Sequence, residues 1–452
     1  MKKTFAILLV AILLLSFAGC GDKSAPANEG GSSDSAAKII NLWSFTDEIP
    51  GMMDRFKAFY KEKNGKDFPY EIKTNVVATD NGGYQTALDQ ALAGGGADAP
   101  DIYAAEAAFV LKYTQGEASQ YASTYSDLGI DVDNAIKDAQ IAQYTVDVGS
   151  RDGKVVGLGF QATGSAVFYR RSIAKAVWGT DDPAEIGKKI GPGWDQFFKG
   201  AADLKAKGYK AVSGQGDIWK VITNDPSAPH GWLVDGVLDP PAQYLDYYKY
   251  AKELYDNEYS NRTGQWTDAW QADMEPDSKV FAFFGPAWLL NYVIAANHPD
   301  TSGDFAVCES PVPFFWGGTW VLANKDTKVK EGVADIINWI TLDTSDDGLQ
   351  YHWANGTMAL DGSKSTGDTV ASGVVMAKSD GSMDYVGGQN VFDIFVPANA
   401  NASGKNMGPY DETLNSLFDA EVTAYVEGNK SMEDGIKAFK ENAKSQLDLD
   451  SN

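Results

Sequence analysis

The sequence predicts an α/β protein built from two lobes, and three observations support this prediction. The chain has 452 residues, which is enough for two or three domains of ordinary size. From residue 38 onward, short β-branched runs alternate with amphipathic helical stretches. The alternation restarts near residue 154. We therefore expect a second lobe there, with the two lobes exchanging strands across a cleft.

The first lobe is predicted to open with a β-α-β-α-β series. Residues 38–45 (KIINLWSF) form a short β-branched run that is typical of a buried strand. Apolar side chains then recur at helical spacing over residues 49–63. A second strand is expected over 70–78, a Gly-terminated helix over 82–95 and a third strand over 99–105.

The later elements follow the same alternation. Residues 154–176 predict two short strands and then a helix. Further amphipathic helices are expected over 194–208, 244–259 and 329–343, and strand-like runs occur within 281–290 and 316–325. The tail, 409–447, is predicted to be helical with one break at Gly428 and Asn429.

Composition and charge exclude several classes of function. Hydrophobic residues make up 44% of the chain and charged residues 22%, as in ordinary globular proteins. The 38 Lys and Arg against 62 Asp and Glu give a net charge of −24, which repels the phosphates of nucleic acids. Only three His residues are present, which leaves little for zinc or for histidine-based catalysis. We therefore expect no nucleic-acid partner, no metal and no cofactor.

The first twenty residues predict export and a lipid anchor. Two lysines precede an apolar stretch over residues 4–15, and small residues then lead into Cys20. The segment resembles a bacterial lipoprotein signal, although Phe17 departs from the Leu that is usual three residues before the cysteine. This resemblance implies that Cys20 becomes the lipidated first residue of the mature chain. An ordinary secretory signal, cleaved after another small residue, is the alternative.

The segment after Cys20 predicts how the chain is held at the membrane. Residues 20–37 are rich in Gly, Ser and Ala and contain no large apolar residue, so they are expected to form a flexible tether. The protein would then sit on the extracellular face of the cytoplasmic membrane. Cys308 has no partner for an intrachain disulfide if Cys20 carries lipid, and its apolar surroundings predict a buried, inert thiol.

Six segments, in order along the chain, resemble one known family. They are NLWSFTDE at 41–48, APDIYAAE at 99–106, GLGFQATGSAVFYRRS at 157–172, VFAFFGPAWLL at 280–290, FFWGGTWVLANK at 314–325 and GGQNVFDIF at 387–395. Together they resemble the extracellular solute-binding proteins of carbohydrate ABC transporters, family 1, of the maltose-binding-protein type. Arg170 departs from the Asn or Asp usual in the third segment, at the expected helix start rather than at the ligand.

The resemblance implies a fold and an order of domains. The fold is the two-lobed periplasmic-binding-protein type II, in which a hinge joins the lobes around a ligand cleft. The expected divisions are 1–19 signal peptide, 20–37 tether, 38–150 first lobe, 151–305 second lobe, 306–355 return to the first lobe, and 356–452 C-terminal helices mainly on the second lobe.

Aromatic and carboxylate side chains that occur close together predict a carbohydrate site. Sugars bind through apolar C–H faces, which stack on aromatic rings, and through hydroxyls, which need directional hydrogen bonds. Several such residues follow predicted strands, where α/β folds place their ligands. The candidates are Trp43, Asp47, Glu48, Glu106, Gln161, Trp270, Trp288, Trp316, Gln389 and Asn390.

Most of these residues also have a purely structural interpretation. Asp47 and Glu48 precede a predicted helix and could stabilise its N-terminus. Glu106 could be a solvated carboxylate at a helix start, and Trp270 could lie on the buried face of a helix. Gln389 and Asn390 could cap a helix instead of binding ligand.

The sequence thus predicts a non-enzymatic, monomeric, lipid-anchored receptor of an ABC importer that binds a neutral oligosaccharide and delivers it to a membrane permease. A secreted glycoside hydrolase is one alternative, because aromatic rings and paired carboxylates also line such active sites. No G-x-S-x-G, P-loop or H-E-x-x-H motif indicates other chemistry. A sugar-sensing surface receptor is a second alternative, since it would use the same fold.

Overall fold

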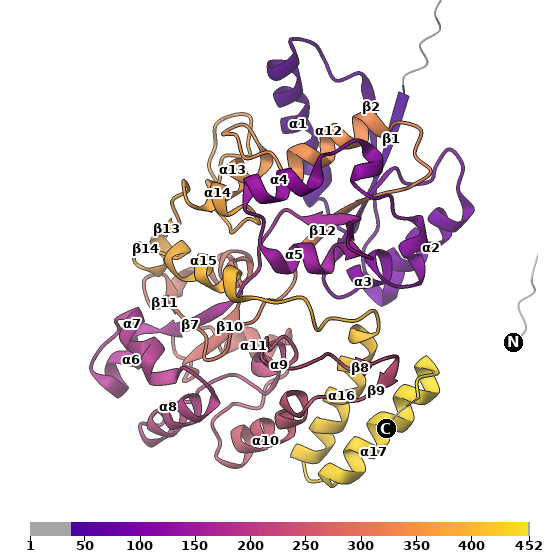
Figure 1. Cartoon of the computed structure of the whole chain (residues 1–452). Helices are drawn as coiled ribbons and strands as arrows, with labels where there is room; N and C mark the ends of the chain where they lie inside the picture. Colours follow the sequence, from indigo (N-terminus) through magenta and orange to yellow (C-terminus); the bar gives the residue numbers. More distant parts are fainter. Residues whose placement is uncertain (1–37, 451–452) are drawn as a thin grey trace, which may run out of the picture. The chain divides into compact units, whose positions relative to one another are not determined.

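The computed structural model describes residues 38–450, within a compact unit that runs from residue 37 to the end of the chain. The expected signal peptide, the tether and Cys20 lie outside the described residues. In the described part, no helix is long and apolar enough to cross a membrane. Figure 1 shows helices packed around two larger sheets, which confirms the predicted α/β class.

The first lobe contains a five-stranded sheet in the order β2-β1-β3-β12-β6. Its strands are β1 (Lys38–Ser44), β2 (Tyr70–Val76), β3 (Ile102–Glu106), β6 (Gly157–Gly159) and β12 (Thr319–Ala323). β1 pairs in parallel with β2 and β3, whereas β12 is antiparallel to β3 and β6. Because parallel strands end at the same edge of a sheet, Trp43 on β1 and Glu106 on β3 lie at one edge.

Helices connect and cover these strands. α1 (Glu48–Asn64) joins β1 to β2, and α2 (Gly83–Gly94) joins β2 to β3. Phe56 of α1 packs on Trp339 of α12 (Lys330–Thr341) with ring centroids 5.5 Å apart, and both side chains are fully buried. The other helices of this lobe are α3 (Val110–Thr114), α4 (Val132–Ala139), α5 (Gln143–Val148) and α13 (Leu349–Ala354).

The second lobe is built on an antiparallel sheet in the order β10-β7-β11. These strands are β7 (Ala166–Arg170), β10 (Ala282–Gly285) and β11 (Phe305–Cys308), and every residue in them is buried. Its helices are α6 (Arg171–Trp178), α7 (Pro183–Ile190), α8 (Trp194–Ala206), α9 (Gly216–Thr223), α10 (Ala242–Asp256), α11 (Asp268–Ala272), α16 (Asp411–Val426), α17 (Met432–Leu447) and a π-helix, Leu289–Ala295. Cys308 is fully buried at the end of β11, as predicted.

The chain crosses between the sheets at positions that differ from the expected divisions. β6 pairs with β12 in the first sheet, although the second lobe was expected to begin at residue 151. β11 pairs with β7, so the second sheet extends past residue 305. α14 (Gly373–Met376) contacts α4 and α13 of the first lobe, whereas α16 packs on α10 of the second. Strands of three to five buried residues have no polar face, so their sequences do not indicate which sheet they join.

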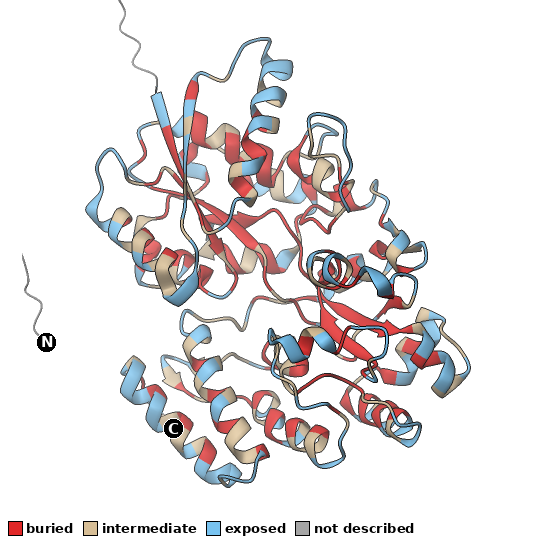
Figure 2. Ribbon diagram, turned by 180° about the vertical axis from the view of Figure 1, so that it is seen from behind, coloured by how far each residue is buried: buried red, intermediate tan, exposed pale blue. Residues whose placement is uncertain are grey.

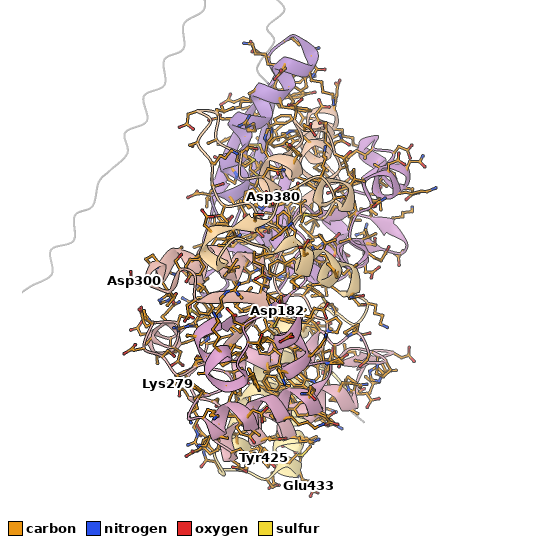
Figure 3. The ribbon with its side chains drawn as sticks, turned by 90° about the vertical axis from the view of Figure 1, so that its left-hand side faces the viewer. Asp182, Lys279, Asp300, Asp380, Tyr425 and Glu433 are labelled. Atoms are coloured by element: carbon orange, nitrogen blue, oxygen red, sulfur yellow. The ribbon has the colours of Figure 1, made fainter. Side chains whose placement is uncertain are left out.

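The remaining strands and α-helix of the described chain lie outside the two larger sheets. They are β4 (Ser150–Arg151), β5 (Lys154–Val155), β8 (Leu233–Val234), β9 (Val237–Leu238), β13 (Ser382–Met383), β14 (Gln389–Asn390) and α15 (Phe392–Asn401). Figure 2 shows the buried residues along both sheets and on the inner faces of the helices. The acidic side chains of Asp182, Asp300, Asp380 and Glu433 are exposed on the surface (Figure 3), in keeping with the large negative charge.

Candidate functional site

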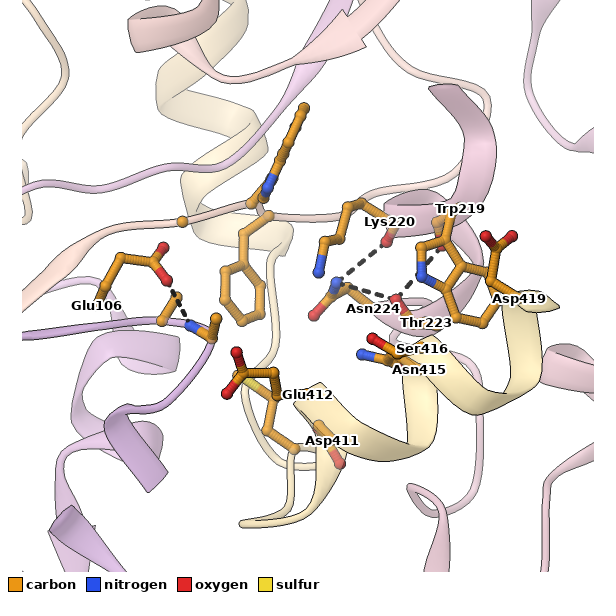
Figure 4. A pocket seen from close by; sticks show the side chains of 16 residues that line it. Glu106, Trp219, Lys220, Thr223, Asn224, Asp411, Glu412, Asn415, Ser416 and Asp419 are labelled. Carbon is orange, nitrogen blue, oxygen red and sulfur yellow. Dashed lines mark hydrogen bonds between the residues drawn. The ribbon is translucent and has the colours of Figure 1, made fainter. Parts of the chain in front are cut away.

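A cavity of about 340 Å³ is lined by residues from both lobes (Figure 4). The first lobe contributes the residues that follow β3 and the segment that leads into β12. The second lobe contributes one face of α9 and the start of α16. The lining residues are Glu106, Ala107, Ala108, Trp219, Lys220, Thr223, Asn224, Phe315, Trp316, Gly317, Met407, Asp411, Glu412, Asn415, Ser416 and Asp419.

Glu106 ends β3 and brings its carboxylate to the cavity. The first four residues of β3 are buried, and the chain turns immediately after Glu106. The backbone N–H of Ala108 donates to Glu106 Oε2 at 2.7 Å, which fixes the carboxylate in the turn. Burial raises the pKa of Glu106, and the hydrogen bond to Ala108 opposes this shift. Glu106 is therefore a positioned, half-buried carboxylate rather than a freely solvated one.

Lys220 enters the same cavity from α9 on the second lobe. Figure 4 shows Glu106 on one side of the cavity and Lys220 with Trp219 on the other. Burial lowers the pKa of Lys220, while the charges of Glu106, Asp411 and Glu412 raise it. Within the described residues, no carboxylate lies within 4.0 Å of the Lys220 amine. A cation and several carboxylates thus face one cavity without direct pairing.

Three tryptophans form an aromatic cluster beside the cavity. Trp316 lines the cavity, and its ring lies 5.1 Å from Trp288 and 5.7 Å from Trp266 in edge-to-face geometry. The rings of Trp266 and Trp288 are nearly parallel, at 11°, with centroids 6.3 Å apart. Trp288 Nε1 donates to the Trp316 carbonyl oxygen at 3.1 Å, which fixes the orientation of the Trp288 ring.

Gly317 allows the backbone to pass between the aromatic cluster and Glu106. Its φ of +79° favours glycine. A Cβ at this position would lie 3.2 Å from Trp288 Nε1 and 3.5 Å from Glu106 Oε1. Gly317, in the segment WGGTW at 316–320, therefore allows Trp288, Trp316 and Glu106 to lie close together.

A second polar group lies where segments 160–163 and 367–371 cross. Gln161 Nε2 donates to Glu48 Oε1 at 3.2 Å, and burial raises the pKa of Glu48 to about 7. Asp368 is 3% exposed, and its Oδ2 has no hydrogen-bond partner. Burial, with a smaller contribution from the charge of Glu48, raises the pKa of Asp368 to about 7. Partial burial, followed by the charges of Asp368 and Glu48, raises the pKa of Tyr292, which is half exposed on the π-helix.

Two predicted residues near β1 do not line the cavity. Trp43 is half-buried and packs against the core of the first lobe, and the Tyr84 hydroxyl donates to its carbonyl oxygen at 3.4 Å. Asp47 is exposed and stands at the N-cap position of α1 without a side-chain capping hydrogen bond. The structural interpretation of Asp47 as a capping side chain is therefore not seen in this structure.

Three other predicted residues serve the interior of the second lobe. Trp270 is fully buried, and its Nε1 donates to Asp217 Oδ1 at 2.9 Å, so its ring has no free face for a ligand. The Gln389 amide donates to the Val307 carbonyl oxygen and accepts from the Val307 N–H. Asn390 Oδ1 accepts from the Phe392 N–H at 3.1 Å, just before the start of the helix at 392–401. Gln389 and Asn390 border a different cavity, of about 560 Å³.

Sequence analysis did not name four residues that lie in or beside the cavity, in the tryptophan cluster or in the polar group around Asp368. Lys220 and Trp219 lie on α9, and Asp368 lies in a crossing segment without regular structure. Trp266 occurs beside Trp270 in QWTDAWQ, but only the three-dimensional structure shows which of the two is exposed. Two sequence signals were available, the adjacent Trp219 and Lys220 and the nearby Trp266 and Asp268, since an aromatic ring beside a polar side chain is the pattern used for the other candidates.

The family model described as bacterial extracellular solute-binding protein matches residues 53–361 of this chain. No curated protein matches the chain in sequence. Solved structures match its fold over nearly the whole length of both chains, at 15–19% identity for the three cited below.

One similar structure is an extracellular solute-binding protein of family 1, with a TM-score of 0.75, 19% identity, and coverage of 90% of this chain and 99% of that one. A second is the ABC-transporter-associated binding protein of B. animalis subsp. lactis Bl-04 in complex with β-1,6-galactobiose (TM-score 0.60, 19% identity, coverage 92% and 100%). A third is the galacto-N-biose and lacto-N-biose I binding protein of the Bifidobacterium longum ABC transporter. Its TM-score is 0.64 and its identity 15%, and the match covers 93% of this chain and 100% of that one. These likenesses confirm the predicted two-lobed fold.

Proposed function

Because the chain belongs to the bacterial extracellular solute-binding protein family, we propose that it is the substrate-binding component of an ABC importer and captures a neutral oligosaccharide between its lobes. The observation that carries this proposal is the cavity in which Glu106 and Lys220 face each other unpaired beside a tryptophan cluster.

The charges in the cavity suit hydroxyl groups. A hydroxyl both donates and accepts hydrogen bonds, so one sugar hydroxyl can donate to Glu106 and accept from Lys220. The cavity also carries Asp411, Glu412 and Asp419, which disfavour an anionic ligand. Trp219 and Trp316 line the same space, and indole faces stack on the C–H faces of sugars. A neutral, polyhydroxylated ligand satisfies all three conditions.

The similar structures support a sugar as the ligand class. Two of them are complexes with sugars, one with β-1,6-galactobiose and the other with lacto-N-biose. We propose Glu48, Glu106, Gln161 and Trp316 as ligand contacts among the residues identified from sequence. Lys220 joins them as a contact that the sequence did not reveal.

Closure of the lobes is the proposed signal to the permease. Glu106 and Lys220 come from opposite lobes, so a ligand bound to both stabilises the closed arrangement. The proposed monomer is held at the extracellular face of the membrane by lipid on Cys20, through the tether of residues 20–37.

Thermal unfolding of the protein without residues 1–19, measured with a panel of neutral sugars, tests this function. The panel contains β-1,6-galactobiose and the trisaccharides of the xylo-, manno- and malto-series. A ligand at 100 times its dissociation constant adds about 2.7 kcal/mol to the free energy of unfolding, which is readily measured as a rise in Tm. We expect at least one sugar to raise Tm in a saturable manner. No shift across the panel, with a shift for a peptide or an amino acid, would refute the carbohydrate assignment.

The same incubation separates a binding protein from a glycoside hydrolase. Burial raises the pKa of both Glu106 and Asp411, and a raised carboxyl pKa is also required of a catalytic acid. We expect the bound sugar to be recovered intact after prolonged incubation, as judged by chromatography. Release of shorter sugars at a rate proportional to protein concentration would replace the transport proposal with the hydrolase.

A further inference from the structure

Trp266 is the most exposed tryptophan of the described residues. Its side chain is 54% exposed, whereas neighbouring Trp270 is fully buried. The two rings contact each other with centroids 5.1 Å apart, and Trp266 also contacts Trp316, which lines the ligand cavity. A large apolar ring is thus held in solvent directly beside the proposed ligand site.

The backbone of Trp266 is strained. Its φ is +68°, a conformation that bulky residues rarely adopt and that persists only where the surroundings enforce it. Here the surroundings do enforce it. Asp273 accepts hydrogen bonds from Asn261 and Thr263 before Trp266, and Thr267 directly after it caps α11.

The same network ties this loop to the start of α9. The Ser213 hydroxyl donates to Asp273 at 2.6 Å, and the Thr263 N–H donates to the Ser213 carbonyl oxygen at 3.2 Å. Arg262 lies over the Tyr255 ring at 3.6 Å. The ring of Trp266 therefore projects from a loop that is anchored on both sides, and the strain is maintained for a side chain that leaves about half of its surface in solvent.

The spacing of Trp266 and Trp288 excludes a sugar between them. Each ring-to-sugar contact needs about 3.5–4.0 Å between carbon atoms, so a ring sandwiched between two indoles needs a separation of about 7 Å or more. The centroids of these nearly parallel rings are 6.3 Å apart. A sugar that stacks on this pair must therefore use an outward face, and the ring of Trp266 is the more exposed of the two.

We propose that Trp266, rather than Trp288, is the platform on which a pyranose ring of the ligand stacks, and that Trp266 is a specificity-determining residue of the site. Trp288 and Trp270 are then positioning residues, which hold the Trp266 ring from behind. This inference rests on the proposed function and refines it, because it identifies the aromatic surface that recognises the sugar.

Four variants test the assignment: W266A, W266F, W266G and the control W178A. Trp178 is a half-buried tryptophan of α6 that does not line the cavity. Affinity is measured by calorimetry with the sugar of the panel that gives the largest thermal shift. We expect W266A and W266G to weaken binding about tenfold or more, W266F to retain most of the affinity, and W178A to bind as the wild type does.

Thermal stability in the absence of sugar provides the second measurement. Glycine adopts φ of +68° without strain, so W266G is expected to unfold at or above the wild-type Tm while its affinity falls. A structural tryptophan would instead lose stability in both W266A and W266G. A clearly lower Tm for W266G than for the wild type would therefore overturn the proposal.

The binding outcomes separate this inference from the proposed function. If the wild type binds a sugar and W266A binds it within twofold or more tightly, Trp266 is not the platform, whereas the proposed function stands. If the wild type binds no sugar of the panel, the proposed function fails and the stacking assignment fails with it.

Discussion

Lys220 is the only cationic side chain among the described residues that line the cavity. Its pKa is lowered by burial, which means that the folded protein desolvates the ammonium group without a direct ion pair. We expect K220M to weaken sugar binding about tenfold or more, because hydrogen bonds to charged groups contribute about 1.5–3 kcal/mol. The free energy of unfolding should stay the same or rise, since methionine carries no charge to desolvate.

Calorimetric titration and urea unfolding of K220M measure these two effects. The matched control is K188M, which removes an exposed lysine of the second lobe that borders the other cavity. K188M should change neither quantity by a measurable amount. Equal sugar affinity in K220M and wild type would remove Lys220 from the proposed contacts.

Sequence analysis named single residues that line the cavity only where they lie at or near the end of a recognisable strand. Glu106 and Trp316 adjoin β3 and β12, and the structure brings both to the cavity. Trp266 and Trp270 have similar sequence surroundings, yet one is exposed and the other is core. The difference arises because Asp217, distant in sequence, accepts a hydrogen bond from Trp270. No local pattern contains that information.

At the scale of elements, helical periodicity predicted most boundaries within a few residues. The helix expected over 49–63 is α1, at 48–64, and the expected break at residues 428–429 separates α16 from α17. The order of strands in the sheets was harder to predict from the sequence, because strands that pair can be far apart along the chain. β12 joins β3 and β6 across more than 150 residues. Sequence alternation identified such strands without showing their neighbours.

Two helical glycines illustrate how packing overrides helix propensity. A Cβ on Gly332 of α12 would lie 2.7 Å from the Tyr70 ring and 2.9 Å from Ile40 Cδ1, whereas one on Gly51 of α1 would meet nothing within 4 Å. We expect G332A to lower the free energy of unfolding by about 1–3 kcal/mol, because α12 must move away from the sheet. G51A should raise it by about 0.5–1 kcal/mol.

Chemical denaturation of the two variants provides the comparison, and each serves as the control for the other. The substitution is identical, so differences in side-chain entropy cancel. If the free energy of unfolding changed by the same amount and in the same direction in G332A and G51A, then α12 would not pack on β1 and β2 as closely as the structure indicates. Sugar affinity should be unaffected in G51A, which lies on the exposed side of α1.

For the whole molecule, buried carboxyl groups determine how stability depends on pH. Burial raises the pKa of Asp217 to about 6 and the pKa values of Glu48, Asp368 and Asp411 to about 7. Their pKa values in the unfolded chain are near 4, so between about pH 4 and 7 the folded state binds more protons than the unfolded state. Stability then falls as pH rises through this window. Half-buried Asp181 acts in the opposite direction, because Lys175 and Arg171 outweigh the effect of burial and lower its pKa.

The net charge of −24 adds to the same trend, since repulsion among ionised carboxylates grows as pH rises. We expect Tm to be higher at pH 5.5 than at pH 8. D368N should flatten this dependence and be more stable than the wild type at pH 8, by at most about 4 kcal/mol, because the unpaired Oδ2 of Asp368 no longer carries charge. The gain should shrink toward pH 5, where Asp368 is protonated.

The control is D380N, at an exposed carboxylate whose pKa is lowered by hydrogen bonds from Ser382. This variant should show no gain at pH 8 and the same pH profile as the wild type. Differential scanning calorimetry of the three proteins between pH 5 and 8 measures all of these quantities. A wild-type Tm that rises toward pH 8, or a D368N profile parallel to that of the wild type, would show that Asp368 is ionised at little cost. The ionised Asp368 carboxylate, in segment 367–371, would then have a compensating partner that the structure does not show.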